Sequence, residues 1–449
     1  MKRVLILVYI SLVLLSSIQS KDSKEWRKFK KEFLAKINNE NVNICKSAIK
    51  DLEPYETLAA AKLAILFFKR KEYDIYELAY PLLRKFNKSE KIGLWILKKG
   101  MPHIRDPLAK AYVINSLGAY KFESIANALE KFLIKSKRVE LIIPFMETLG
   151  ELHFESSIPV LIKKRSSSFY KVHYGFRKTL FETLFKYETK EVVTFFIKVL
   201  FENEGIIADQ ITQYLTSITG ATKGSSKKWK EWLAANKDKF QLKKITKESR
   251  EAILGRSWKN DTEITYHDIP INGKRVVFVI DTSGSMNTKA GSDVTRMAQA
   301  KEELKFAVMQ LSKDFMYEII DFSGSGRPWF KRLIKSHKNS FKLFSNKLRK
   351  LTANGGTNSY DALSKAFETS LTTEVIFFLS DGAPSVGEFI RKDDILREIR
   401  LLNRFRKITI HTISFARKPK NRNADKKDDK KEVFMEALAH QNDGQHKYK

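Results

Sequence analysis

Three oxygen-bearing residues follow one apolar run and could together hold a metal ion. The run RVVFVID, residues 275–281, ends on Asp281, and Ser283 and Ser285 follow at alternate positions. An acidic residue at the end of a buried strand, with two hydroxyls beside it, can direct three hard oxygen donors at one point. Magnesium and similar cations take oxygen ligands, and a site with few carboxylates leaves positions for water or an incoming ligand. The motif therefore predicts a site that binds something through a metal.

Two later loops carry further oxygen donors. Asp381 follows the apolar run EVIFFLS and precedes Gly382. Thr357 lies in ANGGTNSYDAL, where two glycines allow a tight turn and the threonine can both cap the next helix and offer a hydroxyl. We expect five oxygen-bearing side chains from three loops to converge.

The elements that position these loops alternate between strands and helices. Such alternation predicts a mainly parallel, doubly wound α/β sheet, in which ligands sit beyond the carboxyl ends of the strands. Residues 328–334 are expected as an antiparallel edge strand after a short turn. The strand candidates are residues 275–281, 316–322, 328–334, 374–380 and 407–416, and the helical segments are residues 295–313, 338–350, 358–370 and 390–404.

The region from Lys274 to the C-terminus resembles a von Willebrand factor A (vWA) domain. Its D-x-S-x-S motif, the GGT loop and the strand ending in SDG fill all five positions of that family's metal-ion-dependent adhesion site (MIDAS). The resemblance implies a Rossmann-like fold, Mg²⁺ or Mn²⁺ ahead of Ca²⁺ as the bound cation, and an acidic residue of a protein partner as the last ligand. The metal ligands that it implies are Asp281, Ser283, Ser285, Thr357 and Asp381.

The ending FMEALAHQNDGQHKYK fits the last helix and strand of the same family, so residues 274–449 are predicted as the vWA domain. The polar insert at residues 417–432 departs from a short connection, and we interpret it as a solvated loop.

Enzyme motifs are missing from the sequence. A phosphotransferase of the haloacid dehalogenase type needs a second acid where Ser283 stands, and neither a G-x-S-x-G elbow nor a phosphate-binding P-loop occurs. His411, within the apolar stretch ITIHTISF, is interpreted as a packed core residue and not as a metal ligand. We predict that the protein is not an enzyme; a cryptic hydrolase is the alternative.

Residues 24–240 carry helical periodicity and a repeat. The segments that begin at Leu117, Leu149 and Leu184 align at the spacing of a two-helix unit, and they resemble HEAT repeats. An irregular helical bundle is the alternative before residue 100. Trp229 and Trp232 are expected to cap the last repeat, with a binding platform as the other interpretation, and residues 241–273 are expected to be a linker.

The first twenty residues follow the order of a signal peptide: basic, apolar, then small and polar. We therefore predict an exported protein, periplasmic or extracellular, with no transmembrane span in the mature chain; an uncleaved anchor is the alternative. Cys45 is the single cysteine, so no intramolecular disulfide can form, and we expect it to be a small core residue.

The net charge is +31, from 83 Lys and Arg against 52 Asp and Glu. Nucleic acid is disfavoured because no base-reading or stacking motif accompanies the charge. An anionic envelope polymer is a further candidate partner, although a lysine-rich proteome explains the charge equally well.

Two functions follow from these observations. The first is an exported, non-enzymatic, adhesion-type protein that captures an acidic residue of a partner through a divalent cation, with the helical repeats as a second interaction surface. The alternative is a scaffold or regulatory subunit of an envelope enzyme or secretion complex, with contacts dominated by the solenoid.

Overall fold

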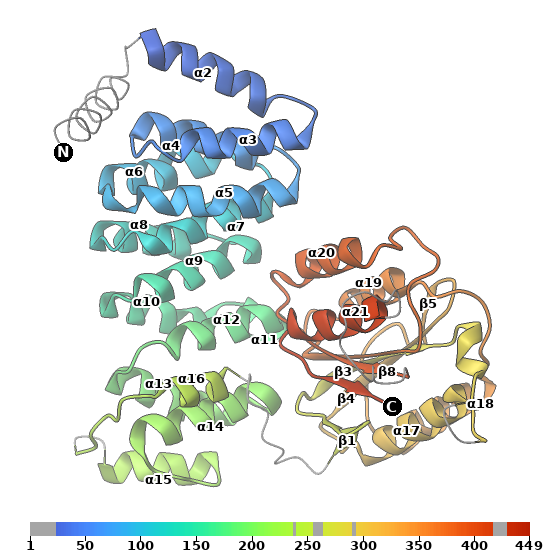
Figure 1. The fold of residues 1–449 in the computed structure, drawn as a ribbon. Helices are drawn as coiled ribbons and strands as arrows, with labels where there is room; N and C mark the ends of the chain where they lie inside the picture. Colours follow the sequence, from blue (N-terminus) through green and yellow to red (C-terminus); the bar gives the residue numbers. More distant parts are fainter. Residues whose placement is uncertain (1–23, 237–238, 255–263, 290–292, 416–428) are drawn as a thin grey trace, which may run out of the picture. The chain divides into compact units, whose positions relative to one another are not determined.

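The computed structural model describes residues 24–236, 239–254, 264–289, 293–415 and 429–449 (Figure 1). The chain divides into two compact units, residues 1–163 and residues 164–449. The predicted signal peptide and most of the insert at 417–432 lie outside the described residues. Within the described ranges, no helix is long and apolar enough to cross a bilayer.

The described part of the first unit is helical, and its helices stack in two rows (Figure 1). In one row α3 packs on α5, α5 on α7 and α7 on α9, while α4 packs on α6 and α6 on α8 in the other. The helices are α2 (Lys24–Ile37), α3 (Val42–Leu52), α4 (Leu58–Ala64), α5 (Tyr73–Lys85), α6 (Glu90–Trp95), α7 (Pro107–Ser116), α8 (Glu123–Lys135), α9 (Val139–Leu152) and α10 (Ile158–Lys163).

Hydrogen bonds between successive layers reinforce this stack of helices. The Tyr120 hydroxyl donates to the carbonyl of Leu83 over 2.8 Å, and the Asn115 amide donates to Glu147 over 2.9 Å. Cys45 is fully buried, which confirms its place in the core. Hydrogen bonds thus add to the apolar packing between successive helices of the row α3, α5, α7 and α9.

The second unit begins with further helices. They are α11 (Phe169–Val172), α12 (Tyr174–Leu184), α13 (Lys190–Val199), α14 (Gly205–Thr219), α15 (Ser226–Asn236) and α16 (Lys247–Ile253). Trp229 is fully buried, and its ring meets that of Trp232 edge-on with centroids 5.6 Å apart. The stretch predicted as a linker contains α16, which packs on α14, and a small hairpin formed by β1 (Thr265–Tyr266) and β2 (Ile269–Pro270); the predicted domain limits stay a prediction.

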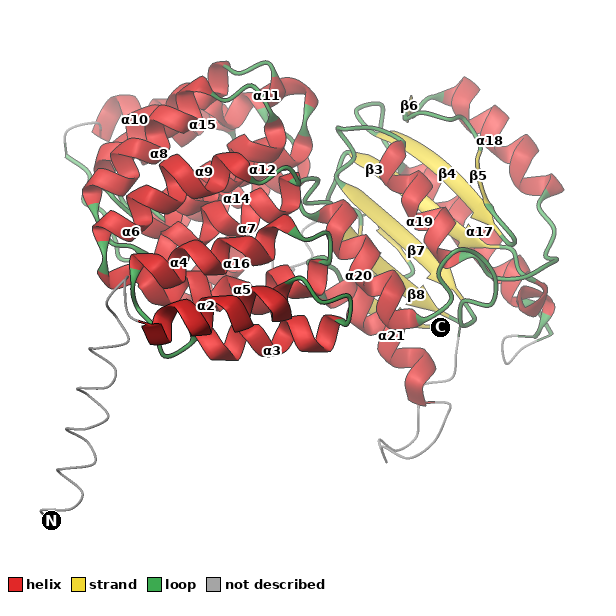
Figure 2. Ribbon diagram, turned by 90° about the horizontal axis from the view of Figure 1, so that it is seen from above, coloured by secondary structure: helices red, strands yellow, loops and turns green. Residues whose placement is uncertain are grey.

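The C-terminal part of this unit is a seven-stranded mixed sheet in the order β5-β4-β3-β7-β8-β9, with β6 also paired to β4 (Figure 2). The predicted α/β fold class is confirmed. Strands β3, β4, β7, β8 and β9 are parallel to one another. The strands are β3 (Arg275–Asp281), β4 (Met316–Phe322), β5 (Gly326–Pro328), β6 (Ile334–Lys335), β7 (Val375–Ser380), β8 (Thr409–Ser414) and β9 (His446–Tyr448).

Helices cover both faces of the sheet, which explains why its central strands are apolar at nearly every position. Alternate residues of β3 separate into two cores: Val276, Phe278 and Ile280 face α17 and α18, while Val277 and Val279 face α19, α20 and α21. The helices are α17 (Arg296–Gln310), α18 (Lys338–Lys350), α19 (Ser359–Glu368), α20 (Lys392–Asn403) and α21 (Asp429–His440).

The predicted edge strand at 328–334 differs from the structure. Two short strands, β5 and β6, pair antiparallel with β4, and residues 329–333 between them are not a strand. The buried carboxylate of Glu318 accepts hydrogen bonds from the backbone N–H groups of Phe330 and Arg332, at 3.0 Å each, and Lys331 between them has a φ of 59°. The Glu318 carboxylate thus takes the place of the backbone carbonyl groups that would accept these N–H groups in a regular sheet. The strand is therefore interrupted between β5 and β6.

Helix α12 packs on the turn between α20 and β8. A Cβ added to Gly175 would lie 2.1 Å from the carbonyl oxygen of Phe405, so this helix and the turn touch backbone to backbone. Lys178, only 3% exposed, reaches Asp443 at 3.5 Å and Glu182 at 3.8 Å. The helical and α/β parts of the second unit therefore share a close, polar contact.

Candidate metal centre

Three loops bring the five predicted ligand residues to the carboxyl end of two adjacent parallel strands. Asp281 ends β3, and Asp381 directly follows β7. Ser283 precedes the short 3₁₀ helix η9 (Gly284–Asn287), which contains Ser285, and Thr357 precedes α19. In the sheet, β3 lies between β4 and β7, so the chain winds outward from β3 in opposite directions. The carboxyl ends of β3 and β7 therefore mark the point where the winding of the sheet reverses.

The side-chain oxygens of these residues form one connected group. The hydroxyls of Ser283 and Ser285 are 3.0 Å apart, and the Ser285 hydroxyl donates to Oδ1 of Asp381 over 2.7 Å. The hydroxyls of Ser285 and Thr357 each lie 3.8 Å from a Cβ position built on Gly382. The side-chain oxygens of four of the five residues, all except Asp281, therefore lie around one small volume.

Asp281 stands behind this group and supports it. Its Oδ1 accepts the backbone N–H of Ser283 over 2.7 Å, and its Oδ2 accepts the hydroxyl of Ser380 over 2.6 Å. Burial raises the pKa of Asp281 to about 6, and the hydrogen bonds from Ser380 and Ser283 oppose that rise. A cation nearby would favour the ionised carboxylate that burial disfavours.

The loop that carries Thr357 is fixed against the first strand by backbone contacts. Gly284 donates its N–H to the carbonyl of Gly355 over 3.0 Å, and Asn354 donates to the carbonyl of Thr282 over 2.7 Å. Gly355 has a φ of 87°, which a residue with a Cβ rarely adopts, so the glycine in the GGT sequence has a backbone reason. The Ser385 hydroxyl accepts the N–H of Thr357 over 2.9 Å and joins the loops from β7 and α19.

Three contributors to the site were not predicted from the sequence. Ser380 bonds Asp281, Ser385 holds Thr357, and Arg296 forms an ion pair with Asp381 at 2.6 Å. Ser380 could have been found, because it precedes Asp381 in the same strand-ending SDG motif. Nothing in the sequence around Arg296 or Ser385 points to the site.

The donor set suits a small hard cation. It combines three hydroxyls with two carboxylates, and Mg²⁺ and Mn²⁺ prefer such oxygen ligands. Over the described residues, no group of three or more His, Cys, Asp or Glu side chains is placed to hold a metal, so any site here depends on the serine and threonine oxygens. The role of the five residues as ligands stays a prediction.

His411 is packed in β8, as predicted. It is 1% exposed, its ring stacks on Phe377 with centroids 4.9 Å apart, and its Nδ1 accepts the N–H of Gln445 over 3.0 Å. Burial lowers the pKa of His411 to about 3, so the ring is neutral in the fold. It is a core residue and lies in the middle of a strand, away from the loops that carry the candidate site.

Residues 276–383, which run from β3 through β7 and contain the candidate metal centre, match the family model described as the von Willebrand factor type A domain. Among related sequences, inter-alpha-trypsin inhibitor, heavy chain 4, of Mus musculus is 31% identical over 132 residues, which are 27% of this chain and 13% of that protein. Heavy chain H3 of Bos taurus is 31% identical over 143 residues, 29% of this chain and 15% of that protein. This chain thus spans only 13% to 15% of the length of these relatives.

Among solved structures, a von Willebrand factor type A protein from Catenulispora acidiphila is 17% identical with a TM-score of 0.31, over 39% of this chain and 38% of that chain. The PilB minor pilin from Streptococcus sanguinis is 16% identical with a TM-score of 0.31, over 40% and 58%. The RO (RSR) protein of Deinococcus radiodurans is 10% identical with a TM-score of 0.24, over 85% and 86%.

Proposed function

We propose that this protein binds a protein partner through a divalent cation, Mg²⁺ or Mn²⁺, held by Asp281, Ser283, Ser285, Thr357 and Asp381. The domain match and the relatives support a protein-interaction role. The observation that carries the metal proposal is the hydroxyl pair of Ser283 and Ser285, bonded to Asp381 at the carboxyl end of β7.

Ligand completion is the proposed mechanism. A cation bound mostly by neutral hydroxyls keeps much of its positive charge, and an acidic side chain of the partner would therefore be favoured as the last ligand. The serine and threonine hydroxyls bind and position the cation, and the buried Asp281 fixes the loop that carries Ser283. The protein side contributes binding and orientation, and no bond is broken.

We propose a periplasmic or extracellular location on the basis of the signal-like first twenty residues. We also propose that the helices of residues 24–240 are HEAT-like repeats, which the two stacked rows of the first unit support.

Mn²⁺ binding tests the metal proposal directly. Free Mn²⁺ is measured by electron paramagnetic resonance while wild type, Asp281→Ala and Thr357→Val are titrated. We expect wild type to bind one Mn²⁺, displaceable by Mg²⁺, and both variants to lose at least tenfold in affinity. Thr373→Val is the matched control, because Thr373 is a buried threonine whose hydroxyl has no hydrogen-bond partner among the described residues, located just before β7 at the other end of the sheet. Equal binding by all four proteins, or none by wild type, would contradict the proposal.

A second measurement addresses the partner's acidic residue. A peptide containing one aspartate should displace a water molecule from bound Mn²⁺ and lower the relaxation rate of water protons, while the same peptide with asparagine should not. If both peptides act alike, the cation does not select a carboxylate.

A scaffold or regulatory subunit remains the alternative, and the long double row of helices in the first unit favours it. Chelation separates the two functions. A complex held by the helices should survive EDTA, whereas one that depends on the cation should dissociate.

A further inference from the structure

One segment of the α/β part of the second unit carries basic side chains and no acidic ones. Residues 322–360 include nine Lys and Arg and no Asp or Glu, although the whole chain has 52 acids. Arg327 pairs with Asp321 of the neighbouring strand. The other eight basic side chains are exposed and have no ion-pair partner among the described residues; they are Lys331, Arg332, Lys335, Lys338, Lys342, Lys347, Arg349 and Lys350.

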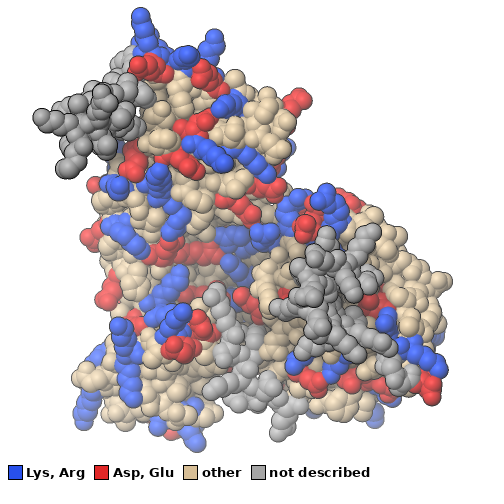
Figure 3. All heavy atoms as spheres, in the orientation of Figure 1, with Lys and Arg blue, Asp and Glu red and all other residues tan. Residues whose placement is uncertain are grey.

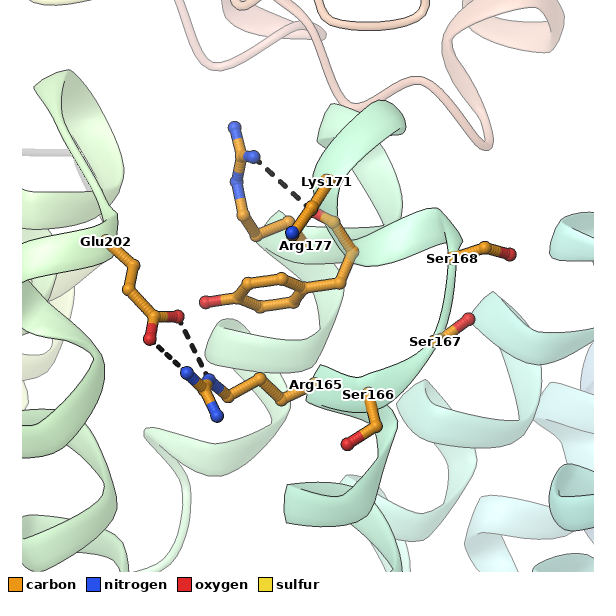
Figure 4. Close-up of a pocket in the computed structure, with 8 residues that line it drawn as sticks. Arg165, Ser166, Ser167, Ser168, Lys171, Arg177 and Glu202 are labelled. Atoms are coloured by element: carbon orange, nitrogen blue, oxygen red, sulfur yellow. Dashed lines mark hydrogen bonds and ion pairs between the residues drawn. The ribbon is translucent and has the colours of Figure 1, made fainter.

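The arginines of a pocket among the helices at the start of the second unit are, by contrast, already paired (Figure 4). Arg165 donates from its Nε to Glu202 over 3.0 Å, and Nη2 of Arg177 lies 3.7 Å from Glu374. Acids of the protein itself therefore neutralise these two arginines. The eight cations of residues 331–350 keep their charge toward solvent, so they can attract an anionic partner.

The backbone that carries these cations is held in place. Phe330 and Arg332 donate their N–H groups to the buried Glu318, as described above. Helix α18 begins with a capping box, in which Nδ1 of His337 accepts the N–H of Ser340 over 3.1 Å and the Ser340 hydroxyl accepts the N–H of His337 over 3.0 Å. The cations thus stand on a fixed surface beside β5 and β6 (Figure 2), and a partner does not have to order the chain.

Helix α18 turns its apolar side inward and a lysine-rich side outward. Phe344 and Leu348 are buried in the core on one face of the sheet. On the outward side Leu343 is 57% exposed, and Lys347 and Lys350 follow it at four and seven residues, on the same face of the helix. The inner side is needed for the core, so a partner meets the lysines with one leucine among them.

The composition of this surface fits a membrane better than a protein or a nucleic acid. Protein interfaces are depleted in Lys and enriched in Arg and aromatic residues. Here six of the eight unpaired cations are Lys, and α18 exposes no Phe, Tyr or Trp that could stack on a base. Lysine ammonium groups on flexible stems suit mobile anionic headgroups. Exposed apolar side chains can enter the membrane interface, and α17, which packs on α18, exposes Phe306 and Met309 as well.

We propose that residues 331–350 dock onto a membrane surface rich in anionic lipid headgroups. The lysines lie at the level of the lipid phosphates, where their charge is complementary, and Leu343 enters the boundary between headgroups and acyl chains. None of these residues belongs to the candidate metal centre. Attachment therefore needs no divalent cation, and it is separate from the capture of a protein partner.

Sedimentation with sucrose-loaded vesicles tests this proposal on the full-length protein in the presence of EDTA. One set of vesicles is phosphatidylcholine alone, and the other is phosphatidylcholine and phosphatidylglycerol in equal parts. Binding to phosphatidylcholine alone measures what the apolar first twenty residues contribute. We expect at least tenfold tighter binding to the anionic vesicles in about 0.1 M salt, and loss of that difference in about 1 M salt, where the Debye length falls from about 10 to about 3 Å. Equal binding to both sets in low salt would overturn the proposal.

A triple variant assigns the binding to α18. Lys342→Gln, Lys347→Gln and Lys350→Gln together should weaken binding to the anionic vesicles at least tenfold, because each lysine near such a surface contributes separately. The matched control is the combination of Lys228→Gln, Lys239→Gln and Lys244→Gln, which changes the net charge by the same amount at three other exposed lysines that have no ion-pair partner among the described residues. The control should bind as wild type does. Equal losses in the two triple variants would show that binding follows net charge alone, and would overturn the proposal.

Leu343→Asn distinguishes a membrane from a polyanion in solution. It keeps every charge, and it should weaken binding to the anionic vesicles at least threefold, because an apolar side chain no longer enters the interface. Ile134→Asn, at an exposed isoleucine of α8, is the control and should have no effect. Unchanged binding by Leu343→Asn would overturn the insertion of this side chain. Tighter binding of a soluble thymidine oligonucleotide than of the vesicles would overturn the choice of a membrane. Because EDTA is present throughout, these outcomes do not depend on the metal proposal.

Discussion

The guanidinium of Arg296 lies 2.6 Å from Oδ2 of Asp381, whose side chain is fully buried, and the other carboxylate oxygen of Asp381 accepts the hydroxyl of Ser285. Arg296 is the first residue of α17, and its side chain is 23% exposed. A positive side chain therefore already neutralises one carboxylate of the candidate metal centre. A cation that approaches Asp381 has to compete with it.

Arg296→Gln should strengthen the binding of Mn²⁺. Removal of the competing charge leaves Asp381 free to interact with the cation, and we expect affinity to rise about tenfold, which corresponds to about 1.4 kcal/mol. The measurement is the Mn²⁺ titration used for the metal proposal. Lys289→Gln is the control, because Lys289 is an exposed cation that pairs with Asp293 in the preceding loop. Weaker binding by Arg296→Gln would mean that the arginine orients Asp381 for the metal.

The charged side chains outside the candidate metal centre are of both signs. On the face drawn in Figure 3, Lys and Arg side chains are interspersed with Asp and Glu. Among the described residues visible on this face, the charges form no single basic patch of the kind that a polyanion such as nucleic acid would need.

Replacement of Glu318 should measurably lower the free energy of unfolding. Its carboxylate is fully buried and accepts the N–H groups of Ile319, Phe330 and Arg332. Glu318→Ala would leave these donors without a partner and open a cavity, and we expect a loss of about 2–4 kcal/mol in the free energy of unfolding. Urea denaturation measures this.

Glu318→Gln separates charge from hydrogen bonding at the same position. The amide keeps one acceptor oxygen, and it lacks the negative charge whose burial raises the pKa of Glu318. We expect this variant to be destabilised less than Glu318→Ala. If both variants unfold at the wild-type urea concentration, the side chain does not hold the segment between β5 and β6.

The same residue shows where prediction from sequence succeeded and where it failed. The central strands are apolar on both faces, so β3 and β4 were predicted at the residues where they occur. The edge segment at 328–334 is also apolar, but its N–H groups bond to a glutamate from the neighbouring strand, and no local pattern reveals that contact. Arg296 and Gly175 are similar cases, because their roles arise from residues far away in the chain.

His411 makes stability depend on pH. Burial holds its pKa in the folded state at about 3, well below the value of about 6.5 expected in the unfolded chain. The unfolded chain therefore takes up a proton below pH 6.5 that the fold does not, and stability is lost as the pH falls. The loss approaches about 1.4 kcal/mol for each pH unit, so about 2 kcal/mol should disappear between pH 6.5 and pH 5.

Comparison with a variant isolates this residue from other titrating groups. His267, whose pKa burial lowers to about 4, and Asp281, whose pKa burial raises, contribute equally to wild type and to His411→Gln. The free energies of unfolding of the two proteins, measured by urea denaturation at pH 7, 6 and 5, should therefore differ progressively. Parallel curves would show that His411 takes up its proton in the fold.

Gly175→Ala tests the contact between α12 and the turn before β8. The added methyl group would meet the backbone carbonyl oxygens of Phe405 and Arg406, at 2.1 and 2.7 Å, and neither can move without shifting the turn. We expect a destabilisation of about 1–3 kcal/mol or more, as for other overpacked sites, and a lower thermal midpoint. Gly224→Ala is the matched control, because an added Cβ there meets no atom within 4 Å. If the two variants melt together, the helical and α/β parts of the second unit do not depend on this contact. If only Gly175→Ala melts early, the close approach of these backbones explains why a residue without a side chain stands at the start of α12.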